Sequence, residues 1–382
     1  MKNEMFVALR PSITTIVRPS FMKGIVRPSL AVVAIYLLYL LFLIVSRGYS
    51  ALDFVHLGTV WSLRDQAGSW GYDGQFYYQL ARDPLQAYHF MDNASYRYQR
   101  ILYPLIVSLL TLKNSALIPY VLLFINLASI IGSVEIVSYL LCKRNLSMWY
   151  SLALGLYYGQ AAALAFDTAE PFTCFLVCAG IWLLLNDRIR SAAICLGLAC
   201  LAREVAILFP LAYVVQYSMQ KRWRTAIVIS LYGCVPILLW LSLLVLLFGH
   251  TGMTFTPPFE HVPFAGLFYY ILTPRKFWLL FLLLFLPTLG SSMLCVWEIM
   301  QKRIGSGLIA WVLNLLPIIF LSHASYIDLI SCGRIATCLV LAALMYGIVT
   351  RNAVILWFTQ IYALTFLVFG LGVVLHMQAF LL

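Results

Sequence analysis

The stretch Val354-Ile-Leu-Trp-Phe-Thr-Gln-Ile-Tyr-Ala-Leu-Thr-Phe-Leu-Val-Phe-Gly-Leu-Gly-Val-Val374 contains no charged residue and no proline. A helix of this length rises 1.5 Å per residue and crosses the roughly 30 Å hydrocarbon core of a bilayer. Similar runs recur along the 382 residues, of which 63% are hydrophobic and 10% charged. Runs such as Trp278 to Leu286 do not alternate as the strands of a membrane β-barrel do. We therefore predict an all-α, polytopic transmembrane helical bundle.

The apolar runs predict about 11 spans and a C-terminus outside the cytoplasm. The stretch 101–112 is too short for a comfortable crossing, so we expect a partial or broken helix there. Around Ala202 to Val205 we expect two short helices that meet at the outer face rather than one long helix, because no bare charge then crosses hydrocarbon. The predicted spans are about 31–45, 118–141, 149–166, 172–185, 191–202, 205–219, 227–248, 277–297, 308–322, 335–349 and 354–374.

The domain organisation predicted from these runs is simple. Residues 1–30 form a cytoplasmic basic arm, residues 31–382 form a single transmembrane domain, and residues 47–100 form a large extracytoplasmic loop. The arm repeats Arg-Pro-Ser at Arg10, Arg18 and Arg27. We interpret it as a retained anchor on the positively charged inner side, with a docking element as the alternative.

Charge separates by predicted side, which argues that one membrane face carries the chemistry. Under this topology the inner loops hold most of the lysines and arginines between spans, as the positive-inside rule expects. Dispersed in this way, the formal charge of +11 gives no support for a nucleic-acid partner. The carboxylates predicted on the external side are Asp53, Asp65, Asp73, Asp83, Asp92, Asp167, Glu170, Glu204, Glu260 and Asp328.

The nine cysteines fall mostly within predicted helices and are interpreted as small buried residues. The chain has no CxxC pair, no HExxH and no histidine-rich tract. We therefore predict neither a thioredoxin-like function nor a zinc site, and no metal-ligand residue is assigned.

The segment Gly-Tyr-Asp-Gly-Gln-Phe-Tyr-Tyr at 71–78 concentrates polar and aromatic groups between apolar runs. Asp73 lies between Gly71 and Gly74, which we expect to let the loop approach a ligand closely. Apolar walls would raise the pKa of such a carboxyl toward neutrality and suit it to act as a general base. The alternative is an ordinary loop aspartate within an interfacial aromatic belt.

Further charged groups follow at the same predicted face. Arg97 and Arg100 precede a proline-containing apolar run, where a guanidinium can bind phosphate bidentately or simply anchor a helix end. Asp167 and Glu170 lie where one helix ends and the next begins. The clusters Arg203-Glu204 and Asp328 to Arg334 add more charge, for which mutual ion pairing within each cluster is the simple interpretation.

These segments carry a resemblance to a known superfamily. The motif at 71–78, Ala81-Arg82-Asp83-Pro84, the run Tyr96 to Pro104 and Leu201-Ala202-Arg203-Glu204 resemble bacterial membrane proteins related to the GT-C glycosyltransferases, over about residues 29–220. The resemblance implies a first helix, an external loop with a catalytic acid at Asp73, and a second helix that begins at Arg100 and Pro104. Asp167 or Glu170 would match a second acidic position. The loop lacks the Asp-Glu or Asp-x-Asp doublet of other members, and no soluble C-terminal domain follows.

What the resemblance implies is a transferase that moves a sugar from a polyprenyl-phosphate donor to an unknown extracytoplasmic acceptor in the bacterial cytoplasmic membrane. Asp73 would be the base, and Arg100, Arg203 or Arg334 would hold the departing phosphate. No cofactor is firmly predicted, and a divalent cation stays open. Two alternatives remain: a lipid-linked-sugar flippase or small-solute transporter, and a non-catalytic assembly subunit. The predicted substrate-binding residues are Tyr72, Gln75, Tyr78, Arg97, Arg100, Asp167, Glu170, Arg203, Glu204 and Arg334.

Overall fold

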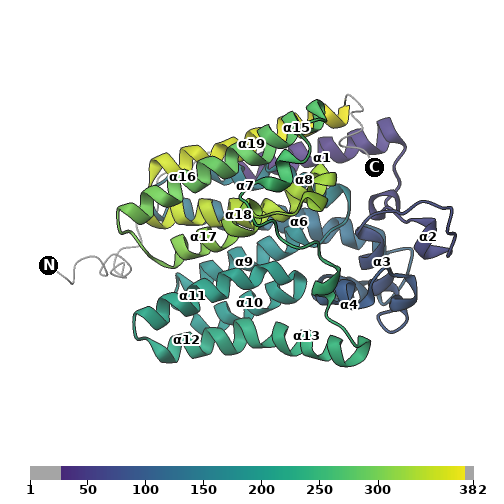
Figure 1. Ribbon diagram of the computed structural model, residues 1–382, viewed down its shortest axis with the longest axis horizontal. Coiled ribbons are helices and arrows are strands. Elements are labelled where there is room, and N and C mark those ends of the chain that lie inside the picture. The colour runs from purple at the N-terminus through teal and green to yellow at the C-terminus, as the bar shows by residue number, and fades with distance from the viewer. Residues whose placement is uncertain (1–26, 375–382) are drawn as a thin grey trace.

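The computed structural model describes residues 27–374, and all regular structure in this range is helical. Helices run roughly along the long axis of the molecule and form one bundle (Figure 1). Most of the basic arm, including Arg10 and Arg18, lies outside the described residues. The all-helical fold predicted from the sequence is confirmed over the described residues. Six helical segments are long and apolar enough to span a membrane: Pro28–Arg47 (α1), Ile118–Lys143 (α6), Trp223–Phe248, Pro274–Met300, Leu329–Thr350 (α18) and Ala353–Val374 (α19).

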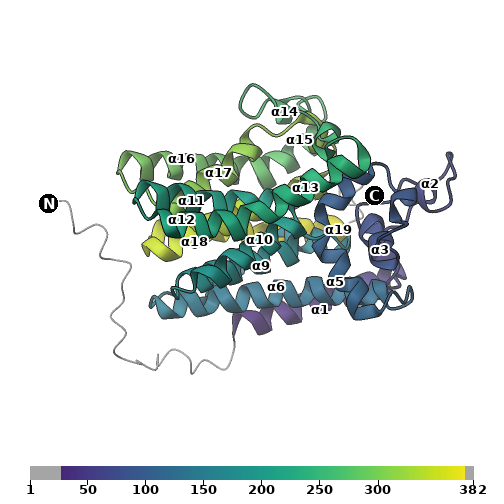
Figure 2. The same ribbon diagram turned by 90° about the horizontal axis from the view of Figure 1, so that it is seen from below.

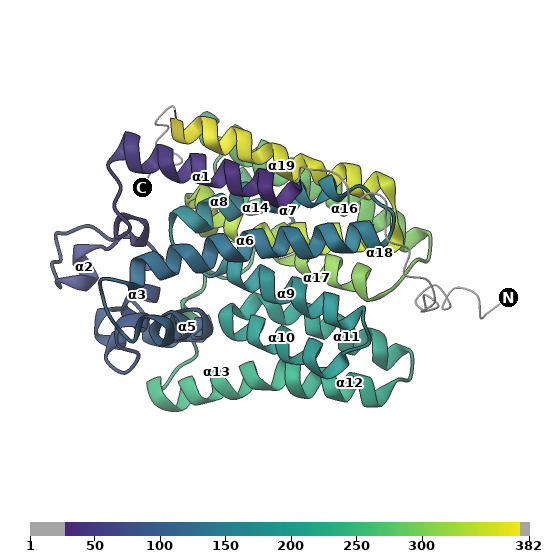
Figure 3. The ribbon, with the colours of Figure 1, turned by 180° about the vertical axis from the view of Figure 1, so that it is seen from behind.

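Shorter apolar helices complete the bundle. The number of membrane crossings, about 11, stays a prediction. They are Leu102–Thr111 (α5), Glu170–Leu184 (α9), Ile189–Ala202 (α10), Leu208–Met219 (α11, preceded by η7 at Glu204–Ile207) and Ser306–Ile319 (α17). Helix α1 packs against α6, and α19, at the other end of the described chain, lies alongside α1 (Figure 3). Arg47 Nη2 in α1 donates to the carbonyl of Val373 in α19 at 2.8 Å.

Two of the long spans contain a π turn immediately before a proline. Trp223–Ile229 (α12) continues through Ser230–Cys234 (η8) into Val235–Phe248 (α13), which has Pro236 in its first turn. Pro274–Leu280 (α15) continues through Phe281–Phe285 (η10) into Leu286–Met300 (α16), which has Pro287 in its first turn. A proline ring crowds the carbonyl four residues earlier, and a wider turn relieves that contact without ending the helix.

The predicted span at 149–166 is not a single regular helix. The chain forms Met148–Ser151 (η6), Leu152–Gly155 (α7) and Tyr158–Ala165 (α8), with extended backbone at Tyr157. A Cβ on Gly159 would collide with the backbone carbonyl of Gly333 in α18. The glycine therefore lets α8 lie directly against α18.

The two uncertain segments of the predicted topology are as expected. Leu102–Thr111 is an isolated helix of 10 residues, which rises only about 15 Å. At Arg203 the backbone is extended (φ −156°, ψ 125°), so α10 ends there and a separate helix follows.

The predicted external loop 47–100 is a compact helical cap. It contains Asp53–Val55 (η3), Thr59–Ser62 (α2), Gly74–Arg82 (α3), Ala87–Phe90 (η4), Ala94–Arg97 (α4) and Tyr98–Arg100 (η5). Helix α3 is buried along nearly its whole length and packs against α5. The cap covers one end of the bundle, and the α11–α12 and α16–α17 turns, which contain Lys221 and Lys302, lie at the opposite end (Figures 1 and 2). Further short elements at the cap end are Gly252–Phe255 (η9), Ala265–Phe268 (α14) and His323–Ile327 (η11).

Candidate functional site

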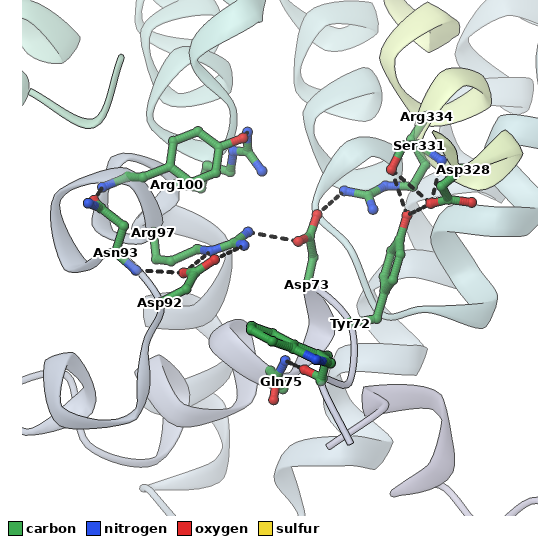
Figure 4. Close-up of polar contacts among 12 residues, drawn as sticks. Tyr72, Asp73, Gln75, Asp92, Asn93, Arg97, Arg100, Asp328, Ser331 and Arg334 are labelled. Atoms are coloured by element: carbon green, nitrogen blue, oxygen red, sulfur yellow. Dashed lines mark hydrogen bonds and ion pairs between the residues drawn. The ribbon is translucent and has the colours of Figure 1, made fainter. Parts of the chain in front are cut away.

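Asp73 lies at the centre of a charged cluster where the cap meets α18 (Figure 4). Its Oδ1 accepts a hydrogen bond from Arg97 Nη1 and its Oδ2 accepts one from Arg334 Nη2, both at 2.7 Å. Burial alone would raise the pKa of Asp73, but the guanidinium groups of Arg97 and Arg334 outweigh burial and hold this pKa well below its ordinary value. The expectation of a raised pKa is therefore wrong for the ion-paired Asp73.

Each of these two arginines is also held by a second carboxylate. Arg97 donates from Nε and Nη2 to the two oxygens of Asp92, at 2.8 and 2.6 Å. Arg334 donates from Nε to Glu170 Oε1 at 2.8 Å. The Arg97 guanidinium also lies 4.0 Å from the ring centroid of Phe76. Both guanidinium planes are thus fixed by contacts that do not involve Asp73.

Arg203 and Arg100 extend the cluster, but not as the sequence predicted. Arg203 is 6% exposed and forms an ion pair with Glu170 Oε1, while Glu204 pairs with Arg100 in a bidentate contact at 3.0 and 2.8 Å. The neighbours Arg203 and Glu204 therefore do not pair with each other, because extended backbone directs them to different partners. Burial, followed by the charges of Arg100 and Arg334, lowers the pKa of Arg203, so positive charge is crowded here.

A cavity of about 210 Å³ opens among these groups. Four arginines and two aspartates line it, whereas the other acids that pair with these arginines, Asp92, Glu170 and Glu204, do not. The α18 N-terminus also faces the cavity through its cap residue Asp328, which accepts hydrogen bonds from two backbone N–H groups and, at 2.5 Å, from the hydroxyl of Tyr72. Such a surface favours an anionic ligand. The lining residues are Asp73, Tyr96, Arg97, Arg100, Arg203, Ala324, Ser325, Asp328, Ser331, Arg334 and Ile335.

Two residues predicted to bind substrate make structural contacts away from the cavity instead. Gln75 accepts from the Gly58 N–H at 3.0 Å and donates to the Trp70 carbonyl at 2.8 Å, and in Figure 4 it lies away from the arginines. Tyr78 packs in a buried apolar cluster with Tyr103. Neither side chain lines the cavity.

The glycines of the motif serve packing within the protein rather than close approach to a ligand. A Cβ on Gly74 would lie 2.5 Å from the carbonyl oxygen of Phe166. Gly71 has φ +65°, a left-handed conformation that suits glycine, and its backbone touches that of Gly58. The loop approaches its own core at these positions and presents only the Asp73 side chain toward the cavity.

The two candidates for a second acidic position lie in different environments. Glu170 joins the ion-pair cluster behind the cavity. Asp167 is fully buried with φ 45°, and neither carboxyl oxygen has a hydrogen-bond partner among the described residues. Burial raises its pKa well above the ordinary value, which favours the neutral acid. Asp167 does not line the cavity.

Several residues of the site had no distinctive signal in the sequence. The sequence identifies Asp92 only as an external carboxylate, although its two oxygens hold the guanidinium group of Arg97. No sequence pattern singles out Tyr96, yet its hydroxyl accepts a hydrogen bond from Arg100 Nη2 at 2.9 Å. Ser331 joins the Asp328 cap through its hydroxyl. A Ser three residues after an Asp resembles any helix start.

Among residues 27–374, no three His, Cys, Asp or Glu side chains are grouped so that they could hold a metal ion. No protein-family model matches the chain, and no curated protein or solved structure matches it either. The resemblance to the GT-C superfamily therefore rests on the motifs alone.

Proposed function

We propose that the protein is an integral membrane glycosyltransferase of the GT-C type, which moves a sugar from a polyprenyl-phosphate donor to an extracytoplasmic acceptor. The observation that carries this proposal is the cavity with four arginines around Asp73 at the capped end of the bundle. A donor of this kind leaves as a phosphate anion, and buried guanidinium groups stabilise such charge better than exposed ones.

The proposed reaction uses groups already in the cavity. The Asp73 carboxylate first leaves Arg97 and Arg334, because pairing with them makes it a weak base. The acceptor hydroxyl then gives its proton to Asp73, and the acceptor oxygen forms a bond to the anomeric carbon of the sugar. The bond between that carbon and the phosphate oxygen breaks, and its electron pair leaves with the polyprenyl phosphate. Four arginines of the cavity are available to stabilise the leaving phosphate, and the resemblance assigns this role to Arg100, Arg203 or Arg334.

The side of the reaction follows from charge. The turns at the far end of the bundle hold Lys221 and Lys302, which the positive-inside rule places in the cytoplasm. The cap and its cavity would then face outward, where nucleotide sugars are absent and a lipid-linked donor is required. We propose the bacterial cytoplasmic membrane as the location.

The test is to purify the full chain in mild detergent and identify the phosphate-containing lipids that copurify by mass spectrometry. The protein is then incubated with a panel of polyprenyl-phosphate hexoses and pentoses in an extract of cell-envelope acceptors. We expect release of polyprenyl phosphate by the wild type and by Glu135→Gln, a substitution at an exposed pair remote from the cavity. No release from any donor would contradict the proposal, and movement of intact donor across vesicles would identify a flippase instead.

A further inference from the structure

We infer that Arg97 and Arg334 form a clamp for the phosphate of the ligand, and that Asp73 occupies this clamp as an internal substitute until the ligand displaces it. The inference rests on the proposed function only for identifying the phosphate as part of a lipid-linked sugar. It replaces Arg100, the first choice from sequence, with two residues that meet at Asp73 from distant parts of the chain (Figure 4).

The clamp remains in place when Asp73 leaves. Asp92 holds two nitrogens of Arg97, and Glu170 holds Nε of Arg334. The nitrogens directed at Asp73 are Arg97 Nη1 and Arg334 Nη2, each at 2.7 Å. A phosphate has oxygen acceptors that can take the places of the two carboxylate oxygens of Asp73.

A phosphate can also use a donor that Asp73 leaves unused. Arg334 is 3% exposed, and its Nη1 has no hydrogen-bond partner among the described residues. A buried unpaired N–H is costly, and a ligand with three or more acceptor oxygens can satisfy it where a carboxylate with two does not. Arg100 differs, because its Nε and Nη2 donate to Glu204, and Asp73 accepts its hydrogen bonds from Arg97 and Arg334 instead.

Asp73 is free to move aside. Its side chain makes no cap hydrogen bond to α3, although it directly precedes that helix. Its carboxylate forms ion pairs with the two arginines, and the side chain remains 24% exposed. Displacement therefore breaks no contact with the backbone, and it leaves a carboxylate beside the ligand without its two cationic partners.

The charge balance of the cluster predicts whether neutralising Asp73 strengthens or weakens anion binding. The groups Asp92, Arg97, Asp73, Arg334, Glu170 and Arg203 form a chain in which carboxylates and guanidinium groups alternate. Neutralising Asp73 leaves an excess positive charge that an anion can replace. Removal of the proposed base should thus strengthen anion binding. Removal of a residue that only contacts the ligand favourably would instead weaken anion binding.

The test measures binding of inorganic phosphate and of a short-chain prenyl phosphate to the full chain in detergent by calorimetry. We expect Asp73→Asn to bind both probes about tenfold more tightly than the wild type, and Arg97→Gln and Arg334→Gln to bind about tenfold or more weakly. Arg27→Gln, at an exposed pair remote from the cavity, is the matched control. Asp73→Ser, which also removes the carboxylate, repeats the test if Asp73→Asn does not fold.

Unchanged or weaker phosphate binding by both Asp73 variants would overturn the clamp. A larger loss with Arg100→Gln than with Arg97→Gln and Arg334→Gln would overturn it as well. Equal affinity of the wild type for the two probes would overturn the lipid assignment and indicate free phosphate. Tighter phosphate binding by Asp73→Asn, without sugar transfer by the wild type, would support the clamp and reject the glycosyltransferase. Sugar transfer by the wild type, without tighter binding by Asp73→Asn, would support the glycosyltransferase and reject the clamp.

Discussion

Replacing Glu170 with glutamine tests whether the charged cluster is as buried as its geometry indicates. Glu170 is 3% exposed, and its Oε1 contacts both Arg203 and Arg334, which are 6% and 3% exposed. The substitution keeps the shape of the side chain but removes the negative charge between two guanidinium groups.

The expected loss in the free energy of unfolding depends on which ion-pair partners remain for Arg203 and Arg334. Arg334 keeps its contact with Asp73, whereas Arg203 loses the ion pair that it forms with Glu170. Breaking a buried ion pair by removing one partner costs about 3 to 5 kcal/mol. The amide oxygen of glutamine still accepts one hydrogen bond, so we expect the free energy of unfolding to fall by about 3 kcal/mol, the lower end of that range.

The assay is denaturant unfolding of the purified protein in mild detergent, followed by tryptophan fluorescence. The matched control is Glu135→Gln, which removes the carboxylate of an ion pair with Arg27 whose side chains are 47% and 52% exposed. That change should cost less than about 1 kcal/mol. A loss below about 1 kcal/mol for Glu170→Gln as well would refute the reasoning, because the cluster would then behave like a solvated surface pair.

Three other outcomes are expected. Asp73→Asn should reduce sugar transfer about 100-fold or more, measured as released polyprenyl phosphate; near-normal transfer would exclude Asp73 as the base. In a variant without reactive native thiols, a cysteine at Ser69 should label with an impermeant maleimide in intact cells and one at Ser147 only after permeabilisation, and the reverse pattern would invert the topology. Burial lowers the pKa of His56 to about 4, so below the unfolded value of about 6.5 the unfolded chain binds the extra proton and stability should fall as the pH drops from about 6.5 to 4. His56→Gln should flatten this slope in unfolding titrations, and an unchanged slope would assign it to other groups.

Hydropathy predicted where the helices are because a bilayer demands long apolar segments, but it misplaced helices that other helices shield. The run 335–349 was predicted as a span, whereas α18 begins six residues earlier, at Leu329. Its first turns contain Ser331 and Arg334, which a lipid-facing helix would exclude. Because 89% of the most apolar window of α18 is buried inside the protein, these polar residues never meet lipid.

The sequence placed the charged segments on one side but not in contact. Asp73 is 24 residues from Arg97 and 261 from Arg334, and nothing in local composition specifies that the three meet. The same limit explains the wrong expectation for the pKa of Asp73. Aromatic and glycine neighbours in sequence suggested an apolar wall, whereas the neighbours in space that decide its pKa are guanidinium groups.

Stability alone gives no reason for this cluster. Apolar residues of similar volume in place of a buried ion pair are often neutral or stabilising by about 1 to 4 kcal/mol. Arg334, Glu170 and Arg203 are nevertheless all buried at the capped end of the bundle, where apolar packing would suffice to join the helices. Ionisable groups within a membrane-spanning bundle are favoured where they bind or transfer charge. The side chains that line the cavity include four guanidinium groups and two carboxylates, whereas the other acids paired with these arginines, Asp92, Glu170 and Glu204, do not line it. The cavity surface therefore favours an anionic ligand, which is the simplest reason for such an arrangement.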